Sequence, residues 1–136
     1  MTIQQYIEQI SNSKNLVLDQ NTDLENNVAK IEGLEFQFED LFQNQNLNSA
    51  LLSKIEKMLN LIFIKEELEF NVCFANNDEV RPEYKQSFRL LDLLDYIYAF
   101  KYSSKFATTQ KIILSPEVEV FWKLVKIGSV LRNDIK

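Results

Sequence analysis

Two aspartates in the second half of the chain have the spacing of a paired-carboxylate site. Asp92 and Asp95 lie three residues apart, and Arg89 precedes Asp92 by the same interval. Residues three apart lie on one side of a helix, so two carboxylates and one guanidinium are expected in a polar stripe. General acid–base chemistry is one use of such a pair. A salt-bridged or solvated stripe is the favoured interpretation, because Arg89 is placed to pair with Asp92.

Other residues suited to catalysis or metal binding are few. The chain contains no His, which excludes His-based acid–base catalysis and the commonest metal ligand. Cys73 is the single Cys and has no basic neighbour in sequence that would activate a thiol. Glu66, Glu67 and Glu69 favour a solvated loop over a cation site. The chain also lacks a Gly-rich phosphate loop. We therefore expect no enzyme, no metal and no cofactor.

Aromatic residues and lysines are interleaved near the aspartate pair. The stretch holds five aromatic residues and three lysines: Tyr96, Tyr98, Phe100, Lys101, Tyr102, Lys105, Phe106 and Lys111. Aromatic rings stack on bases and ammonium groups pair with phosphates, so the stretch is a candidate nucleic-acid contact. In the alternative interpretation the rings fill the core and the lysines solvate its edge.

Charge is unevenly distributed along the 136 residues. The net charge of −5 combines −9 over residues 1–80 with +4 over residues 81–136. An acidic chain argues against independent, non-specific binding to nucleic acid. The basic second half leaves room for a local contact with an anionic partner, and ordinary surface charge is the alternative.

The chain is expected to be a soluble cytoplasmic protein without a membrane partner. No apolar run approaches the roughly 18 residues that a membrane span requires. The first residues lack the basic start and apolar core of a signal peptide. A single Cys agrees with a reducing compartment.

One stretch, from Ser87 to Phe100, predicts the central helix. From Phe88 onward, ten of its thirteen residues are apolar or aromatic, and a helix of this kind is normally surrounded by the rest of the fold. We expect Ser87 to cap its N-terminus, and residues 102–104 to end it.

Two helices are expected in the acidic N-terminal part, residues 1–40. Apolar residues at positions 3, 6, 7 and 10 recur with helical spacing behind Thr2, which is a suitable cap. A second helix is predicted over residues 23–31, with Gly33 as its stop.

The next part of the chain predicts a strand and a third helix. Residues 34–38 alternate as a half-buried strand does, and a helical turn over 39–42 is the alternative. The helix begins at Asn48 or Ser49. Five apolar residues are expected on one face of it: Leu51, Leu52, Ile55, Leu59 and Ile62.

A β-hairpin is expected after this helix. Residues 62–64 and 68–74 are apolar segments separated by Lys65, Glu66 and Glu67. The second segment alternates strictly, which is typical of a strand. The alternative continues the preceding helix through Glu67, because short apolar runs fit either structure.

The end of the chain predicts a short extended segment and a final helix. Residues 112–114 are apolar, and the Ser-Pro-Glu sequence at 115–117 is a strong helix start. Six residues form the apolar face of the helix: Val118, Phe121, Trp122, Val125, Gly128 and Leu131. Gly128 is expected to permit close packing, because Gly inside a helix otherwise costs roughly 1 kcal/mol relative to Ala.

These elements predict an α+β fold that is predominantly helical, with about five helices and a small β-hairpin or short sheet. Two Gly and two Pro are too few for an all-β fold built on tight turns. No internal repeat or compositional break divides the chain, so residues 1–136 are expected to form a single domain.

Two motifs resemble a family of DNA-modifying enzymes. The first is D-L-L-D-Y-I-Y-A-F at residues 92–100, followed by K-Y-S-S-K-F at 101–106, and the second is F-W-K-L-V-K-I-G-S-V-L-R at 121–132. Upstream, N-L-N at 46–48 opens an apolar helix. In order and spacing, residues 44–132 are similar to the C-terminal region of type ISP-like single-chain restriction–modification enzymes, which are adenine-specific DNA methyltransferases.

In that family this region belongs to the part that recognises the DNA target. The resemblance implies a non-catalytic DNA target-recognition or specificity module. Its expected partners are DNA and a methyltransferase or other protein subunit. Six residues of the basic second half are the expected nucleic-acid contacts: Lys101, Tyr102, Lys105, Lys111, Lys123 and Lys126.

The chain departs from the family pattern at several points. A His and a Pro that follow the first motif in the family are replaced by Tyr102 and Ser104, and the tyrosine-rich helix shrinks to residues 106–111. Residues 1–40 match no part of that region. The N-P-P-Y-type catalytic motif and the Gly-rich cofactor motif are absent, so the chain by itself is not expected to methylate or cleave DNA.

A second function class fits the same sequence. The chain is then a small helical protein-interaction or regulatory protein, for example an anti-defence factor, that docks through helical faces and its acidic first half without binding DNA. DNA binding that weakens steeply with salt favours the first class. Recovery of one protein partner without DNA favours the second.

Overall fold

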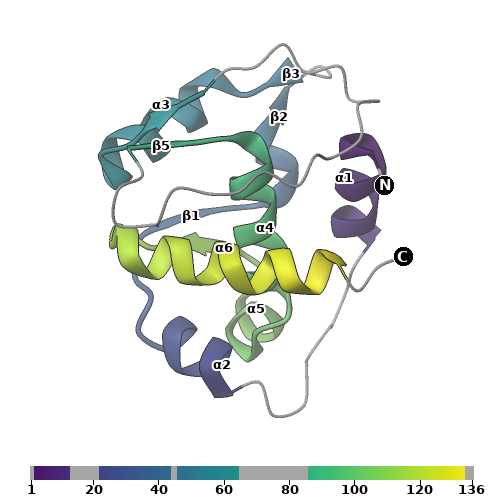
Figure 1. The fold of residues 1–136 in the computed structure, drawn as a ribbon, viewed down its shortest axis with the longest axis vertical. Helices are drawn as coiled ribbons and strands as arrows, with labels where there is room; N and C mark the ends of the chain where they lie inside the picture. Colours follow the sequence, from purple (N-terminus) through teal and green to yellow (C-terminus); the bar gives the residue numbers. More distant parts are fainter. Residues whose placement is uncertain (1, 13–21, 44–45, 65–85, 134–136) are drawn as a thin grey trace.

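The computed structural model describes residues 2–12, 22–43, 46–64 and 86–133 (Figure 1). Within these residues the chain forms six α-helices, one 3₁₀ helix and six short strands. The predicted α+β fold, predominantly helical and in a single compact domain, is confirmed. None of the helices in the described parts of the chain has the length and apolar character needed to span a bilayer.

The central helix is α4 (Leu90–Lys101), and the rest of the fold surrounds it, as the sequence predicts. Its residues 93–100 are all buried, because they are apolar on nearly every side and each side meets another element. Four helices pack against it: α1 (Ile3–Asn12), α2 (Thr22–Val28), α5 (Ser104–Thr109) and α6 (Val118–Asn133). In Figure 1, α6 crosses α4 and α1 lies apart at one edge of the molecule.

The helix α4 begins later than predicted. Ser87 lies in strand β5 (Ser87–Phe88) instead of capping the helix, and Arg89 is the N-cap residue. The Oδ2 atom of Asp92 accepts a hydrogen bond of 2.9 Å from the backbone N–H of Arg89. An acidic residue in the first turn thus bonds the backbone N–H of the N-cap residue, which is one half of a capping box, and the prediction that Ser87 is the cap is wrong.

The contact between α4 and α6 depends on Gly128. A Cβ atom at this position would lie 1.8 Å from the carbonyl oxygen of Asp95 and 2.5 Å from its carbonyl carbon. The two helix backbones therefore approach more closely than any side chain permits, which confirms the predicted close packing. The face of α6 that is buried there includes four of the expected residues: Phe121, Trp122, Val125 and Gly128.

The extended segment before α6 also forms. Residues 112–114 are strand β6 (Ile112–Leu114), and all three are buried. The hydroxyl oxygen of Ser115 then accepts the backbone N–H of Glu117 at 3.0 Å. This turn leads into α6, which begins at Val118, so the helix starts two residues later than a cap at Ser115 predicts.

The first two helices follow the predicted pattern. The Oγ1 atom of Thr2 accepts the backbone N–H of Gln5 at 3.1 Å, and the Thr2 N–H donates to Oε1 of Gln5 at 2.8 Å. Thr2 is therefore the predicted cap of α1. The helix α2 ends at Val28, earlier than the predicted range 23–31, although three apolar residues of that range are buried: Leu24, Val28 and Ile31.

Strand β1 (Leu34–Phe36) pairs antiparallel with β6, with Leu34 opposite Leu114. The prediction that Gly33 ends a helix is wrong. A Cβ there would lie 1.9 Å from the carbonyl oxygen of Leu114, so Gly33 permits the close approach of the two strands. The 3₁₀ helix η1 (Phe38–Leu41) follows β1 at once, which confirms the helical turn given as the alternative.

A small ladder leads into the third helix. Strands β2 (Phe42–Gln43) and β3 (Asn46–Leu47) pair antiparallel. Helix α3 (Ser49–Leu59) follows, and the side chain of Asn48 caps its N-terminus as predicted. Asn60 takes a left-handed conformation that ends the helix. The alternative helix through Glu67 is therefore wrong.

Strand β4 (Ile62–Phe63) pairs parallel with β5. The predicted hairpin partner, residues 68–74, lies outside the described residues. Ile62 is 66% exposed, so it does not belong to the buried face of α3. Ile62 was expected on that face because it continues the apolar spacing of the helix, but α3 ends at Leu59.

Candidate functional site

The polar stripe of α4 faces a neighbouring helix. Asp92, Asp95, Tyr98 and Lys101 follow one another at intervals of three. The last three are buried, and each is hydrogen-bonded to a residue of α1. Of the stripe that the sequence predicts, Arg89 and Asp92 are half-buried, and Asp95 is buried and salt-bridged to Arg132.

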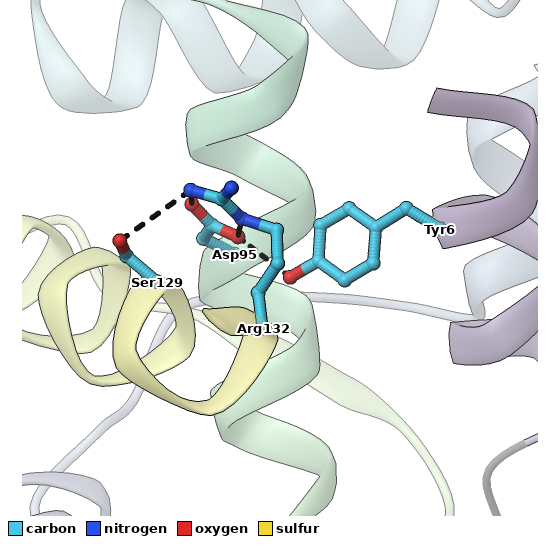
Figure 2. A network of polar contacts seen from close by, with 4 residues as sticks. All are labelled: Tyr6, Asp95, Ser129 and Arg132. Atoms are coloured by element: carbon cyan, nitrogen blue, oxygen red, sulfur yellow. Dashed lines mark hydrogen bonds and ion pairs between the residues drawn. The ribbon is translucent and has the colours of Figure 1, made fainter. Parts of the chain in front are cut away.

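Asp95 joins three helices through its two carboxylate oxygens (Figure 2). Its Oδ1 accepts the hydroxyl of Tyr6 from α1 at 2.6 Å and Nε of Arg132 from α6 at 2.9 Å. Its Oδ2 accepts Nη2 of Arg132 at 3.3 Å. Nη2 also lies 3.4 Å from the hydroxyl of Ser129. The cation that pairs with Asp95 thus comes from the far end of the chain.

Burial governs the protonation of this network. Burial raises the pKa of Asp95 to about 6, although the hydrogen bonds and charge of Arg132 and the hydroxyl of Tyr6 act in the opposite direction. Burial, with the charge of Asp95, also raises the pKa of Tyr6 far above its ordinary value. Tyr6 is consequently a neutral hydrogen-bond donor to a carboxylate that is mostly ionised at neutral pH.

Lys101 holds the C-terminal end of α1. Its Nζ donates to the carbonyl oxygen of Ile10 at 2.6 Å and lies 5.4 Å and 5.5 Å from the ring centroids of Phe38 and Phe106. The last carbonyls of a helix lack intrahelical partners and carry its negative dipole end. Lys101 is 7% exposed, so its ammonium cannot reach a phosphate in this conformation. The predicted contact at Lys101 is therefore not accessible while α1 is in place.

The aspartates lack the geometry of a catalytic pair. Both oxygens of Asp95 are occupied and the residue is 2% exposed, whereas a general base must reach its substrate. Asp92 is engaged by the backbone of Arg89. The described residues include no group of three His, Cys, Asp or Glu side chains that could hold a metal ion. Cys73 and the glutamates at 66, 67 and 69 lie outside them.

Tyr102 and Lys105 are half-buried beside Lys101. The hydroxyl of Tyr102 lies 3.0 Å from that of Tyr98. The Nζ of Lys105 donates to the carbonyl oxygen of Ile31 at 2.7 Å. Both side chains therefore hold neighbouring elements together and present only part of their surface to a ligand.

The other three predicted contacts are exposed. Lys111 directly precedes β6, and Lys123 and Lys126 lie on the outer face of α6. The structure brings Lys123 and Lys126 together, because residues three apart share a helix face. It separates them from Lys101, which points into the core.

A hollow of about 570 Å³ lies between α2 and the start of α6. The α2 side supplies two amides and one ammonium group, and the α6 side supplies a second ammonium group, a carboxylate and an apolar residue: Asn26, Asn27, Lys30, Lys123, Glu117 and Val120. The hollow therefore has one lysine on each side, one carboxylate on each side (Glu32 and Glu117), and two amides on the α2 side.

The α2 side of this hollow was missed by reasoning from sequence. Asn26, Asn27 and Lys30 are far from Lys123 in the chain, and no local pattern links them. The Tyr6–Asp95 bond likewise spans 89 positions. Such pairings depend on how helices cross.

The two motifs that carry the family resemblance meet in the core. Asp95 of the first motif contacts Gly128 and Arg132 of the second. These residues pack α4 against α6, so the resemblance rests on fold-forming side chains. It does not rest on the exposed lysines.

Comparisons with known proteins add no relative. No family model, no curated protein and no solved structure matches this chain. A proposal of function therefore depends on the surface of the chain and on the motifs quoted above.

Proposed function

We propose that the chain is a non-catalytic DNA-contacting module that uses the lysines around the hollow between α2 and α6. The supporting observation is their arrangement: Lys123 and Lys126 are exposed one turn apart on α6, and Lys30 lines the same hollow as Lys123. Ammonium groups spaced in this way suit contact with neighbouring phosphates.

The remaining groups of the hollow fit a contact of modest strength. Asn26 and Asn27 offer amide donors and acceptors for phosphates or base edges. Glu32 and Glu117 also line the hollow and balance the charges of Lys30 and Lys123, so the excess positive charge comes from Lys126 beside it. With the acidic net charge of −5, this favours a module that acts beside another subunit, such as a methyltransferase, as the resemblance implies.

The proposed contact set differs from the sequence-based one. Lys30 is added and Lys101 is removed, because the first is exposed in the hollow and the second is buried. Lys111 stays as an exposed contact. Tyr102 and Lys105 are secondary, since both are half-buried and hydrogen-bonded within the fold.

Salt dependence tests this proposal. Binding of a fluorescein-labelled DNA duplex is measured by anisotropy at several salt concentrations. Four lysine–phosphate contacts, from Lys30, Lys111, Lys123 and Lys126, predict that affinity falls roughly 150-fold between about 50 and about 200 mM salt. A flat salt dependence contradicts the proposal.

A matched pair of double variants locates the contact. Lys123→Gln with Lys126→Gln is expected to weaken binding and to reduce the salt slope by about 2. The control is Lys54→Gln with Lys57→Gln, two exposed lysines with the same spacing on α3. Helix α3 lies at the opposite end of the molecule from α2 (Figure 1). Equal losses from the two double variants would exclude a specific surface at the hollow.

A protein-interaction role is the second candidate, and one observation favours it. Ile62 and Ile64 are 66% and 40% exposed around strand β4, and exposed apolar side chains are common where proteins dock. Recovery of one protein partner that is lost when Ile62 and Ile64 are changed to Lys, with no DNA retained, supports this candidate over the first.

A further inference from the structure

Helix α1 is attached to the core through three polar bonds and a narrow apolar face, of which Ile3 and Ile7 are only partly buried. The hydroxyl of Tyr6 bonds Asp95 at 2.6 Å, and the carbonyl of Ile10 accepts from Lys101 at 2.6 Å. A side-chain hydrogen bond also joins Gln9 to Tyr98. Only Tyr6 and Ile10 of the helix are fully buried. The contact of α1 with α4 thus follows the polar stripe from one end to the other.

The side chains that α1 covers include charged groups, which water stabilises strongly. Lys101 is 7% exposed, and the side chains of Arg132 and Asp95 are 11% and 3% exposed. Taking an ion out of water costs free energy that pairing recovers only in part. When α1 leaves, Lys101 and Arg132 regain water while Asp95 keeps its Arg132 partner.

The opposite side of α4 differs in this respect. Helix α6 covers it with apolar side chains, among them Phe121, Leu124 and Val125. Opening there exposes this larger apolar surface to water and also separates Arg132 of α6 from Asp95. Local opening is therefore expected to cost less at α1 than at α6.

We propose that α1 is a reversible strap whose release exposes a second cationic contact for DNA, formed by Lys101 and Arg132. This inference rests on the proposed function. Release uncovers Lys101 beside the Arg132–Asp95 pair, which together carry one net positive charge, and it removes Glu8, which is the one charged side chain within α1. It also uncovers Tyr98, so that a ring and an ammonium group become accessible side by side, as contact with bases and phosphates requires.

Hydrogen exchange on the full chain tests whether the strap opens. Tyr6→Phe removes one hydroxyl that bonds a carboxylate, and α1 amides are then expected to exchange roughly tenfold faster or more relative to α4 amides. The control is Tyr96→Phe, whose hydroxyl bonds Ile113 and Ser115 and does not touch α1. Exchange of wild-type α1 at the same rate as α4 would overturn the proposal.

DNA affinity tests what the strap covers. Tyr6→Phe is expected to bind the labelled duplex more tightly than wild type, because a larger fraction of the variant is open. The affinity should rise by the same factor as the open fraction, on the order of tenfold. Adding Lys101→Met should abolish that gain. If Tyr6→Phe binds with unchanged affinity while wild-type binding still depends on Lys123 and Lys126, the strap proposal is wrong and the proposed function is still supported. Absence of binding by every variant overturns the proposed function, and exchange then still reports whether α1 opens.

Discussion

Asp95 is the residue on which the packing of three helices depends. A buried carboxylate is tolerated only when hydrogen bonds and an opposite charge replace water. Arg132 supplies the charge through two bonds, and Tyr6 supplies a neutral donor. The charges of Asp95 and Arg132 compensate each other, so removal of either one leaves the other without its opposite charge, whereas removal of the Tyr6 hydroxyl leaves the ion pair in place.

Removal of the guanidinium is expected to be strongly destabilising. Arg132→Met keeps much of the aliphatic stem but leaves Asp95 as a buried charge without its cation. We expect the free energy of unfolding to fall by about 3–5 kcal/mol. Urea denaturation followed by circular dichroism measures this change.

A double variant separates the ion pair from the packing. Asp95→Asn with Arg132→Met removes both charges, so part of the lost stability should return. If the single variant costs less than about 1 kcal/mol, the pair behaves as an exposed salt bridge and its structural role is refuted.

Asp95 is also expected to make folding stability depend on pH. Because burial raises its pKa from 3.8 to about 6, the folded chain binds this proton more tightly than the unfolded chain. The resulting stabilisation is fully present below about pH 4 and is lost as pH rises through about 6, a change of about 3 kcal/mol. The measurement is the difference in unfolding free energy between wild type and Asp95→Asn across this range.

The Asn variant serves as the control because it cannot titrate at this position while the other carboxylates remain. The stability of wild type relative to the variant should decline from about pH 4 to about pH 7. A relative stability that rises over the same interval would show that pairing with Arg132 outweighs burial and lowers the pKa of Asp95.

At the scale of elements, the close crossing of α4 and α6 depends on Gly128, which has no side chain. Gly128 allows the backbone of α6 to touch the carbonyl of Asp95. The same crossing brings Arg132, four residues later, to the Asp95 carboxylate. The close approach of α6 to α4 at Gly128 thus allows both the tight helix packing and the Asp95–Arg132 ion pair.

Gly128→Ala is expected to destabilise the fold despite the better helix propensity of Ala. The new Cβ would overlap backbone atoms that cannot turn aside, so the helices must separate. We expect a net loss of about 2 kcal/mol, because overpacking outweighs the roughly 1 kcal/mol gained from propensity. Thermal and urea unfolding measure the loss.

The matched control for Gly128→Ala is Lys126→Ala, an exposed position on the same helix. Its effect should stay within about 0.5 kcal/mol. A stabilised Gly128→Ala variant would mean that α6 can shift without disturbing the contact with Asp95.

At the scale of the whole molecule, the described elements share one core around α4. Helices from both ends of the chain contact it, α1 from the first residues and α6 from the last. The slowest hydrogen exchange is therefore expected in the amides of residues 93–100, which open only on global unfolding. Exchange in α3 that is slower than in α4 would contradict this organisation.

Local patterns in the sequence predicted most of the helices and their buried faces. The spacing of apolar residues predicted α1, α3, α4 and α6, because a helix that must bury one face shows it every three or four residues. Boundaries were less accurate. The sequence places the helix cap at Ser87, whereas α4 begins after Arg89, whose backbone N–H is bonded by the Asp92 carboxylate. Ile62 fits the apolar spacing of α3 but lies beyond the end of that helix.

By itself, the sequence determined the type of fold, the central helix, the need for a small residue at Gly128 and a polar stripe along α4. These properties follow from side-chain chemistry and spacing within single elements. Only the tertiary structure decided that the stripe is covered by α1, that Asp95 pairs with Arg132, and that Lys101 is buried while Lys30 and Lys123 share a hollow. Each of these depends on how elements distant in sequence cross, and on the balance between desolvation and pairing at that crossing.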